Sequence, residues 1–260
     1  MLKGKCGFIT GGSSGIGKAS AKAMLKYGAK VTVMHRRTGE DLEALKNELG
    51  DNCYFVYGDV ANSKDVEKAV AYAAAQMGRL DFAVNSAGSA TLGKFHELTD
   101  ETFDSTMKIC LYGTFFSMRE ESKLMVAQGS GSIINISSIN STVPAAMYTP
   151  YCTAKAGVDM LTKSAAIELG RYNIKVNAIC PGFIDTPLIH PLLEMDEINE
   201  TVKKGSPMGR VGEPEEIAEM CAFLASDKCG YINGVCIAID SGMQLMAYPS
   251  FLKYIMGEDD

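Results

Sequence analysis

The fold of this chain is decided near its N-terminus, in the stretch Cys6-Gly7-Phe8-Ile9-Thr10-Gly11-Gly12-Ser13-Ser14-Gly15-Ile16-Gly17. An apolar run ends at Thr10, glycines follow, and apolar residues then recur at helical spacing over residues 19–27. This order predicts a strand, a tight glycine turn and a helix. Glycines allow a phosphate to approach the backbone closely, and the start of a helix offers free N–H groups to it. The stretch therefore predicts a βα unit that binds a pyrophosphate, with a plain flexible loop as the alternative.

Further apolar runs typical of buried strands recur along the chain. Together with the first, they lie near residues 6–10, 30–34, 53–57, 81–84, 132–137, 174–180 and 235–240. Helical patterns fill the gaps between them. Continuous apolar strands that alternate with helices are typical of a parallel sheet covered on both faces. We expect one α/β domain over residues 1–260, a doubly wound parallel sheet of about seven strands, with its ligand site beyond the carboxyl ends of the strands.

Three residues in the second half of the chain are typical of acid–base chemistry. Tyr151 and Lys155 are four residues apart on a predicted helix, where such residues share a face. A tyrosine pKa of about 10 is too high for proton transfer near neutrality, and a nearby lysine cation lowers it. Ser138 follows the predicted strand 132–137, so its hydroxyl can hold a carbonyl oxygen near Tyr151. A solvated tyrosine beside a lysine is the alternative for this spacing.

These motifs resemble those of the short-chain dehydrogenase/reductase family, and the resemblance covers nearly the whole chain. The matching segments are Thr10–Gly17, Asp59-Val60, Asn85-Ser86-Ala87-Gly88 with one change, Ser138 with Tyr151 and Lys155, Pro181-Gly182 with Thr186, Pro207-Met208-Gly209-Arg210 and Asp240-Ser241-Gly242. The resemblance implies a Rossmann-type fold and an NAD(P)-dependent oxidoreductase that interconverts a secondary alcohol and a ketone.

The resemblance also implies a role for each matching residue. Tyr151 would act as general acid in reduction and general base in oxidation, and Ser138 would stabilise the substrate oxygen. Lys155 would lower the pKa of Tyr151 and hold the nicotinamide ribose. The residues expected at the cofactor are Gly11, Ser13, Ser14, Gly15, Ile16, Gly17, His35, Arg36, Arg37, Asp59, Val60, Asn85, Ala87, Gly88, Tyr151, Lys155, Pro181, Gly182, Ile184 and Thr186.

The end of the second predicted strand bears on which nicotinamide cofactor is used. His35, Arg36 and Arg37 stand there, and no carboxylate follows until Glu40. An acidic residue would bind the ribose 2′-hydroxyl of NAD, whereas arginine suits the 2′-phosphate of NADP. We predict NADP(H) over NAD(H), with Arg36 as the main contact and Arg37 or His35 assisting. A solvated arginine pair is the alternative, and Ser14 stands where many NADP-preferring relatives have a basic residue.

Cys110 departs from the pattern of the family. The resemblance aligns it with an asparagine that supports a water-mediated proton relay to the lysine. A thiol is a weak hydrogen-bond donor and acceptor and cannot replace an amide. Because Tyr151 and Lys155 remain, we interpret Cys110 as the mark of an altered relay and not of an inactive protein.

The substrate is expected to be apolar. Residues 183–207 form an amphipathic pattern typical of a lid, and no cluster of arginines is present there to bind a carboxylate or phosphate. The stretch 110–120 is also similar to bacterial hydroxysteroid dehydrogenases of the family, which favours a hydroxysteroid or bile acid. Two alternatives stay open: a 3-oxoacyl thioester reductase acting on acyl-carrier-protein or CoA substrates, and a non-catalytic NADP(H)-binding sensor or scaffold.

Composition excludes several classes of function. The net charge of −6 disfavours nucleic-acid binding, and no apolar run reaches the eighteen or so residues of a membrane span. The eight cysteines form no Cys-x-x-Cys pair and the three histidines have no ligand spacing, so we expect no metal. Without a secretion signal the chain is expected in the cytoplasm with reduced thiols.

Two segments bear on assembly. The resemblance implies a homotetramer or homodimer, formed in part through the helix predicted near residues 150–171. The tail 243–260 is apolar, and we expect it to cover the active site or a neighbouring subunit.

Overall fold

The structure, a computed structural model, describes residues 1–246. Its centre is a parallel sheet of seven strands in the order β3-β2-β1-β4-β5-β6-β7. The strands are β1 Cys6–Thr10, β2 Lys30–His35, β3 Cys53–Tyr57, β4 Phe82–Asn85, β5 Gly131–Ile136, β6 Ile174–Pro181 and β7 Cys236–Ile239. Each begins and ends within one residue of the range predicted from the apolar runs, so the predicted fold class is confirmed.

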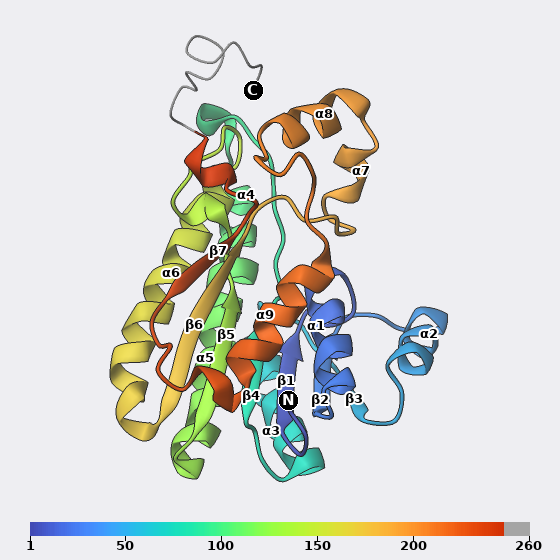
Figure 1. Ribbon diagram of the computed structural model, residues 1–260, viewed down its shortest axis with the longest axis vertical. Helices are drawn as coiled ribbons and strands as arrows, with labels where there is room; N and C mark the ends of the chain where they lie inside the picture. Colours follow the sequence, from blue (N-terminus) through green and yellow to red (C-terminus); the bar gives the residue numbers. More distant parts are fainter. Residues whose placement is uncertain (247–260) are drawn as a thin grey trace.

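Helices cover both faces of the sheet (Figure 1). They are α1 Gly15–Lys26, α2 Glu40–Leu49, α3 Ser63–Met77, α4 Asp100–Met107, α5 Gly113–Gln128, α6 Thr149–Leu169, α7 His190–Leu193, α8 Asp196–Lys204 and α9 Pro214–Ala225. Short turns complete the chain: η1 Phe95–Glu97, η2 Lys108–Tyr112, η3 Ile139–Ser141, η4 Gly170–Tyr172, η5 Asp227–Cys229 and η6 Met243–Leu245. Helices α1, α2 and α9 pack on one face, and α3, α5 and α6 pack on the other.

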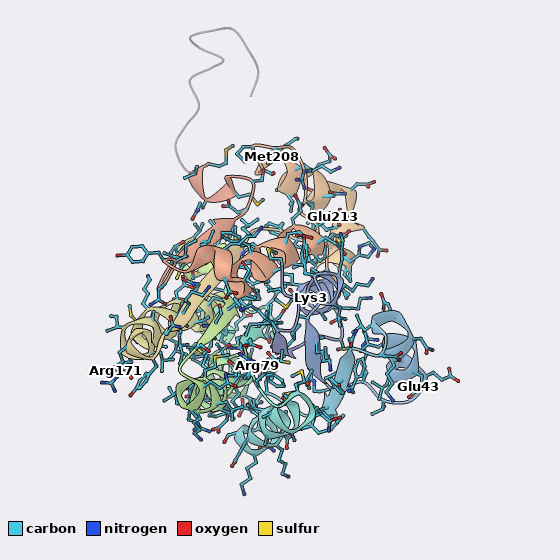
Figure 2. All side chains as sticks on the ribbon, turned by 60° about the horizontal axis from the view of Figure 1, so that its bottom comes forward. Lys3, Glu43, Arg79, Arg171, Met208 and Glu213 are labelled. Atoms are coloured by element: carbon cyan, nitrogen blue, oxygen red, sulfur yellow. The ribbon has the colours of Figure 1, made fainter. Side chains whose placement is uncertain are left out.

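The core consists of two apolar layers, one on each face of the sheet. Neighbouring strand residues point to opposite layers, as the pleat requires: Phe8 packs with α3 and α5, whereas Ile9 packs with α1 and α9. Ile133 and Ile134 alternate in the same way. Figure 2 shows the side chains filling the space between sheet and helices, with the charged Glu43 and Arg171 on opposite sides of the molecule. This double burial explains why the strands are apolar without interruption.

The order of the strands creates the ligand crevice. The chain runs outward from β1 to β2 and β3 and then returns to β4 on the other side of β1. The connections after β1 and β4 therefore leave the sheet in opposite directions, which opens a crevice at the carboxyl ends of these two strands. Thr10 and Asn85 are paired there at the ends of the strands.

The segment predicted as a lid forms helices α7 and α8, which stand beyond the carboxyl ends of the strands (Figure 1). Of the predicted tail, residues 243–246 include η6, and the expectation for residues 247–260 lies outside the described residues. Within residues 1–246, no helix combines the length and apolar character that crossing a membrane requires.

Candidate active site

A cleft of about 660 Å³ lies at the carboxyl ends of the strands. It is lined by the turn after β1, the tip of β2, the segment after β4, the start of α6 and the segment after β6. Of the predicted site residues, all line this cleft except Gly17 and Asn85. Sequence segments that are far apart thus meet in one elongated site.

The glycine turn forms the base of one end of the cleft. Gly11 has a φ of +66°, and a Cβ there would lie 2.8 Å from the backbone of Ala87. Gly17 lies beneath the turn, where a Cβ would collide with the carbonyl oxygen of Gly11. Within the described chain, Ser14 makes no capping hydrogen bond and the first turn of α1 has no acidic residue. The N–H groups of that turn are therefore available to an anion, and the turn fits the pyrophosphate of a dinucleotide.

Three neighbouring residues at the tip of β2 have different environments. His35 is only 4% exposed and its ring lies edge-on to Phe55 and Tyr57. Burial lowers the pKa of His35, which favours the neutral ring and removes it as an exposed cation. Arg36 is exposed, and its guanidinium lies 3.5 Å from a carboxylate oxygen of Asp59. Its neighbour Arg37 lies 3.8 Å from Asp41, so both arginines remain at the rim of the cleft.

Ser138, Tyr151 and Lys155 meet at the other end of the cleft. The Lys155 ammonium is buried, donates a hydrogen bond of 2.7 Å to the carbonyl oxygen of Ile136, and lies 5.5 Å from the centre of the Tyr151 ring. Ser138 accepts a hydrogen bond of 3.1 Å from the backbone N–H of Asn140. The ring of Tyr148 stands edge-on to Tyr151 at 6.2 Å between centroids. The helix and strand end predicted from the spacing thus bring the three groups to one place.

Cys110 is buried next to the catalytic residues and does not line the cleft itself. It lies in the π-helical turn η2 between α4 and α5. Its thiol donates to the carbonyl oxygen of Ser89 at 3.1 Å and accepts from the Ser89 N–H at 3.4 Å. A Cβ on Gly88 would lie 3.9 Å from both the Cys110 sulfur and the Lys155 nitrogen. Cys110 therefore holds the segment after β4 near the lysine, and π-turns are frequent at functional sites.

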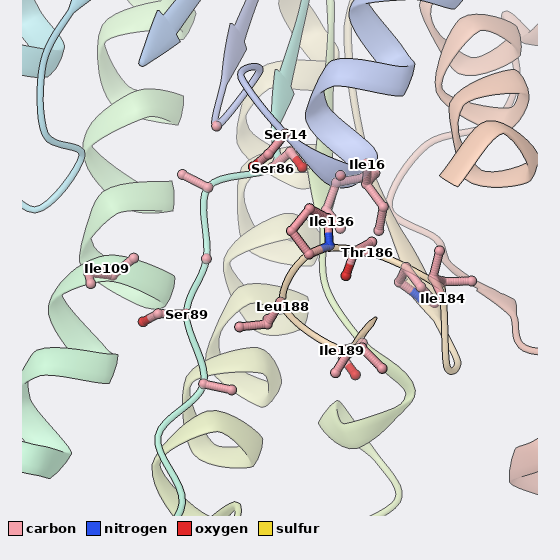
Figure 3. Close-up of a pocket in the computed structure, with 18 of the residues that line it drawn as sticks. Ser14, Ile16, Ser86, Ser89, Ile109, Ile136, Ile184, Thr186, Leu188 and Ile189 are labelled. Carbon is pink, nitrogen blue, oxygen red and sulfur yellow. The ribbon is translucent and has the colours of Figure 1, made fainter. Parts of the chain in front are cut away.

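The segment after β6 closes the front of the cleft. Figure 3 shows Thr186, Leu188 and Ile189 on this segment, facing Ser14 and Ile16 of the glycine turn and Ser89 of the segment after β4. The side chain of Thr186 lies 3.3 Å from the position of a Cβ on Gly15. A residue larger than glycine at position 15 would therefore press on this segment.

The structure also differs from the predicted list of residues. Asn85 is 2% exposed, and its side-chain amide donates hydrogen bonds into the protein interior instead of lining the cleft. Conversely, Asn140, Tyr148 and Ser89 line the cleft although they are not among the predicted catalytic and cofactor-binding residues. For two of them, the position in the sequence predicts a place in the cleft: Asn140 is two residues after Ser138, and Tyr148 is three residues before Tyr151.

Comparison with known proteins identifies the family. The model of a family described as Enoyl-(Acyl carrier protein) reductase matches residues 11–244. A solved short-chain type dehydrogenase/reductase from Mycobacterium ulcerans superposes with a TM-score of 0.91 at 30% identity, covering 98% of this chain and 95% of that one. The chain belongs to the short-chain dehydrogenase/reductase family and is an NAD(P)-dependent alcohol dehydrogenase or ketone reductase.

Three similar relatives are sugar or sugar-alcohol dehydrogenases by name. L-rhamnose-1-dehydrogenase of Scheffersomyces stipitis is 39% identical over 250 residues, which cover 94% of this chain and 97% of the relative. L-rhamnose 1-dehydrogenase (NAD(P)(+)) of Sphingomonas sp. is 34% identical over 247 residues, with coverage of 94% and 97%. D-threitol dehydrogenase of Mycolicibacterium smegmatis is 38% identical over 244 residues, with 93% of each chain covered. None of these three is named for a steroid, so the expected hydroxysteroid is not supported by them.

Proposed function

We propose that this chain oxidises a hydroxyl group of a small polyol or sugar to a carbonyl, reversibly and with NADP(H) preferred over NAD(H). The observation that carries the proposal is the meeting of Ser138, Tyr151 and Lys155 at one end of a cleft whose other end has two arginines. The cofactor supplies or accepts the hydride. The chain then has to orient the substrate and move one proton.

Each of the three residues is suited to one part of that task. With one N–H of Lys155 bound to Ile136, two remain for a ribose hydroxyl and for the Tyr151 oxygen. Tyr151 stands with its ring centre 5.5 Å from the Lys155 ammonium, where it would take the hydroxyl proton in oxidation and return it in reduction. Ser138 accepts from the Asn140 N–H at 3.1 Å, and its O–H donates to Asn140 Oδ1 only at 3.5 Å. A substrate oxygen can replace this long bond, so the hydroxyl would stabilise the charge that develops there.

Polar groups around the reaction centre favour a substrate with several hydroxyls. Tyr148 lines the cleft beside Tyr151, and its phenol hydroxyl can bond a further hydroxyl of the substrate, whereas the Asn140 amide already donates to the carbonyl oxygen of Val143 at 2.9 Å. The names of the three relatives favour the same class. We therefore replace the hydroxysteroid, expected from the sequence, by a polyol or sugar as the leading substrate.

Two other substrates are favoured by particular observations. The apolar residues Phe183, Leu188 and Ile189 line the cleft and suit a steroid. The description of the matching family names an acyl-carrier-protein substrate, which keeps the 3-oxoacyl thioester as a candidate.

The preference for NADP(H) is supported by the tip of β2. Arg36 is exposed and Arg37 half-buried at the rim, and guanidinium groups bind phosphate through paired hydrogen bonds. His35, buried and neutral, is left out of the proposed phosphate contacts. In the glycine turn, Ser13 and Ser14 offer hydroxyls to the same phosphate.

Nicotinamide absorbance tests the proposal. We expect NADP reduction by L-rhamnose, D-threitol or a related polyol, and its loss in Tyr151→Phe, which retains the ring but not the hydroxyl. The same panel includes a hydroxysteroid oxidised with NADP and acetoacetyl-CoA reduced with NADPH.

The outcomes separate the candidates. Turnover confined to the steroid or the thioester would overturn the proposed substrate class. Equal or better turnover with NAD than with NADP would overturn the role of Arg36. Full activity of Tyr151→Phe would refute the assigned proton transfer.

A further inference from the structure

Glu121 is a carboxylic acid sealed inside the protein. It belongs to α5, which packs against strands β4 and β5, and 0% of its surface is exposed. Figure 1 shows α5 beside these strands. An ionised carboxylate is costly in such a place unless a cation or several hydrogen bonds compensate it. The adjacent Glu120 shows the usual solution, since Arg119 at 2.8 Å and Lys123 at 2.6 Å neutralise it at the surface.

Among the described residues, Glu121 has a single hydrogen bond. The side-chain amide of Asn85 donates to its Oε2 at 3.1 Å. Two buried atoms of this pair, Glu121 Oε1 and Asn85 Oδ1, have no partner within residues 1–246. Both are acceptors when the carboxyl is ionised. A proton on Glu121 provides the one missing donor, because a carboxylic acid and an amide can exchange two hydrogen bonds.

Within residues 1–246, no cation compensates a charge on Glu121. Helix α3 presents apolar residues to α5, and the ionisable groups of the other neighbouring elements are engaged elsewhere. Next to β4, Asp81 pairs with Arg79, and on α6, Lys155 bonds the carbonyl oxygen of Ile136 while Asp159 contacts the Cys180 thiol. Burial raises the pKa of Glu121 to about 8, and the hydrogen bond from Asn85 lowers it only in part.

Asn85 connects this pair to the catalytic helix. Its amide donates a second hydrogen bond to Asn135 Oδ1 at 3.0 Å, and the Asn135 amide donates to Thr162 on α6 at 2.9 Å. The chain of bonds therefore crosses from α5 through β4 and β5 to the helix of Tyr151 and Lys155. Residues 86–88, which line the cleft, follow directly after Asn85.

We propose that Glu121 stays protonated in the folded protein and, by pairing with Asn85, positions the cofactor-binding segment 86–88 against the catalytic helix. Glu121 is a positioning residue, since it touches Asn85 and not the cleft. The part of the proposal that concerns the cofactor rests on the proposed function, whereas the protonation state does not.

Unfolding at several pH values tests the protonation state. Above its ordinary pKa of 4.5, Glu121 loses its proton on unfolding but keeps it in the folded protein, so the folded state is destabilised as pH rises toward about 8. Glu121→Gln has the shape and hydrogen bonds of the protonated acid and cannot titrate. The quantity to measure is the ratio of two unfolding constants, that of the wild type over that of Glu121→Gln. We expect this ratio to rise about tenfold per pH unit between pH 5.5 and 7.5 and to level off above pH 8.

The neighbouring residue provides the control. Glu120 is ion-paired and its pKa is lowered, so Glu120→Gln should show no such rise above pH 5.5. Infrared spectra offer a second measurement that needs no unfolding: a protonated-carboxyl band at pH 7 should disappear in Glu121→Gln. A wild-type to Glu121→Gln ratio independent of pH, or a missing infrared band, would overturn the protonated state.

Cofactor binding tests the positioning role. Glu121→Leu leaves Asn85 Oδ1 unpaired and leaves its amide nitrogen with the bond to Asn135 alone. NADPH binding is compared at a temperature where circular dichroism shows all variants folded. NADPH fluorescence should then report binding weaker by about five- to tenfold, with near-normal binding in Glu121→Gln. Unchanged affinity in Glu121→Leu would overturn the positioning role. A wild type that binds no NADPH would instead refute the proposed function, while the pH series would still decide the state of Glu121.

Discussion

At the scale of single residues, burial separates neighbours that look alike in the sequence. His35 is the last residue of β2 and Arg36 follows it, yet the imidazole packs against Phe55 and Tyr57 while the guanidinium reaches the rim of the cleft. The pleat sends consecutive side chains to opposite sides, so one residue joins the protein interior and the next remains exposed. Arg36 is therefore the residue at which the proposed preference for NADP(H) can be tested with the least structural damage.

Arg36→Ala should weaken NADP(H) binding and leave NAD(H) binding unchanged. Charge-assisted hydrogen bonds contribute about 1.5–3 kcal/mol, and the exposure of this side chain argues for the lower end, or roughly tenfold in affinity. Fluorescence titration with NADPH and NADH measures both values in one variant, so NADH binding serves as the control. Equal losses for the two cofactors would point to damage of the β2 tip and against a phosphate contact.

Cys110→Asn should change the pH profile of turnover. The thiol bonds Ser89 and lies close to Lys155, where an amide would add a stronger donor and acceptor to proton exchange. The rate as a function of pH is the measurement, and Cys110→Ser is the control because a hydroxyl retains the paired bonds to Ser89 without an amide. A rate and pH profile identical to the wild type would refute an altered relay.

At the scale of elements, the site is built where turns from distant parts of the chain come into contact. The glycine turn after β1 lies against Ala87 of the segment after β4 and against Thr186 of the segment after β6. The contact with Ala87 leaves no room for a Cβ on Gly11, and the contact with Thr186 is tight for a Cβ on Gly15. The small residues therefore serve the packing of three connections as well as the approach of a phosphate.

Gly11→Ala should destabilise the fold and weaken NADPH binding. A left-handed φ costs an alanine about 1–2 kcal/mol, and the overlap with Ala87 adds about 1–3 kcal/mol. Gly129→Ala is a matched control, because its φ of +71° is similar and nothing lies within 4 Å of the added Cβ. Thermal unfolding of both variants separates the cost of the left-handed φ, which both share, from the cost of the overlap with Ala87, which only Gly11→Ala has. NADPH titration of both variants measures the effect on cofactor binding. Equal stability losses in the two variants would contradict the predicted overlap.

At the scale of the whole molecule, the sheet connects the cofactor end of the cleft to the catalytic end. Strands β1, β2 and β4 supply the turns at one end, and β5 and β6 supply those at the other. A ligand that spans the cleft contacts both halves of the sheet and should therefore stabilise the entire domain.

NADPH should raise the midpoint of thermal unfolding. At a concentration of 100 times its dissociation constant, a ligand adds about 2.7 kcal/mol, which corresponds to about 5–10 °C for a domain of this size. Tyr151→Phe should keep this shift, whereas Arg36→Ala should lose part of it at the same NADPH concentration. A wild type without any shift would contradict cofactor binding in the cleft.

The sequence by itself determined the order of strands and helices, the glycine turn and the spacing of Ser138, Tyr151 and Lys155. These features depend on neighbours along the chain: an apolar run predicts a strand, a glycine permits a tight turn, and a spacing of four aligns two side chains on a helix. The sheet, its strand limits and the meeting of these residues could be predicted for that reason.

Only the tertiary structure decided which side chains are enclosed and which line the cleft. Asn85 was expected at the cofactor and instead pairs with Glu121 and Asn135, residues 36 and 50 positions away. His35 lines the cleft as expected but is only 4% exposed, because its ring packs against aromatic rings of β3. Such outcomes depend on contacts between distant segments, and local patterns do not encode them, because burial is set by the elements that pack together after the chain has folded.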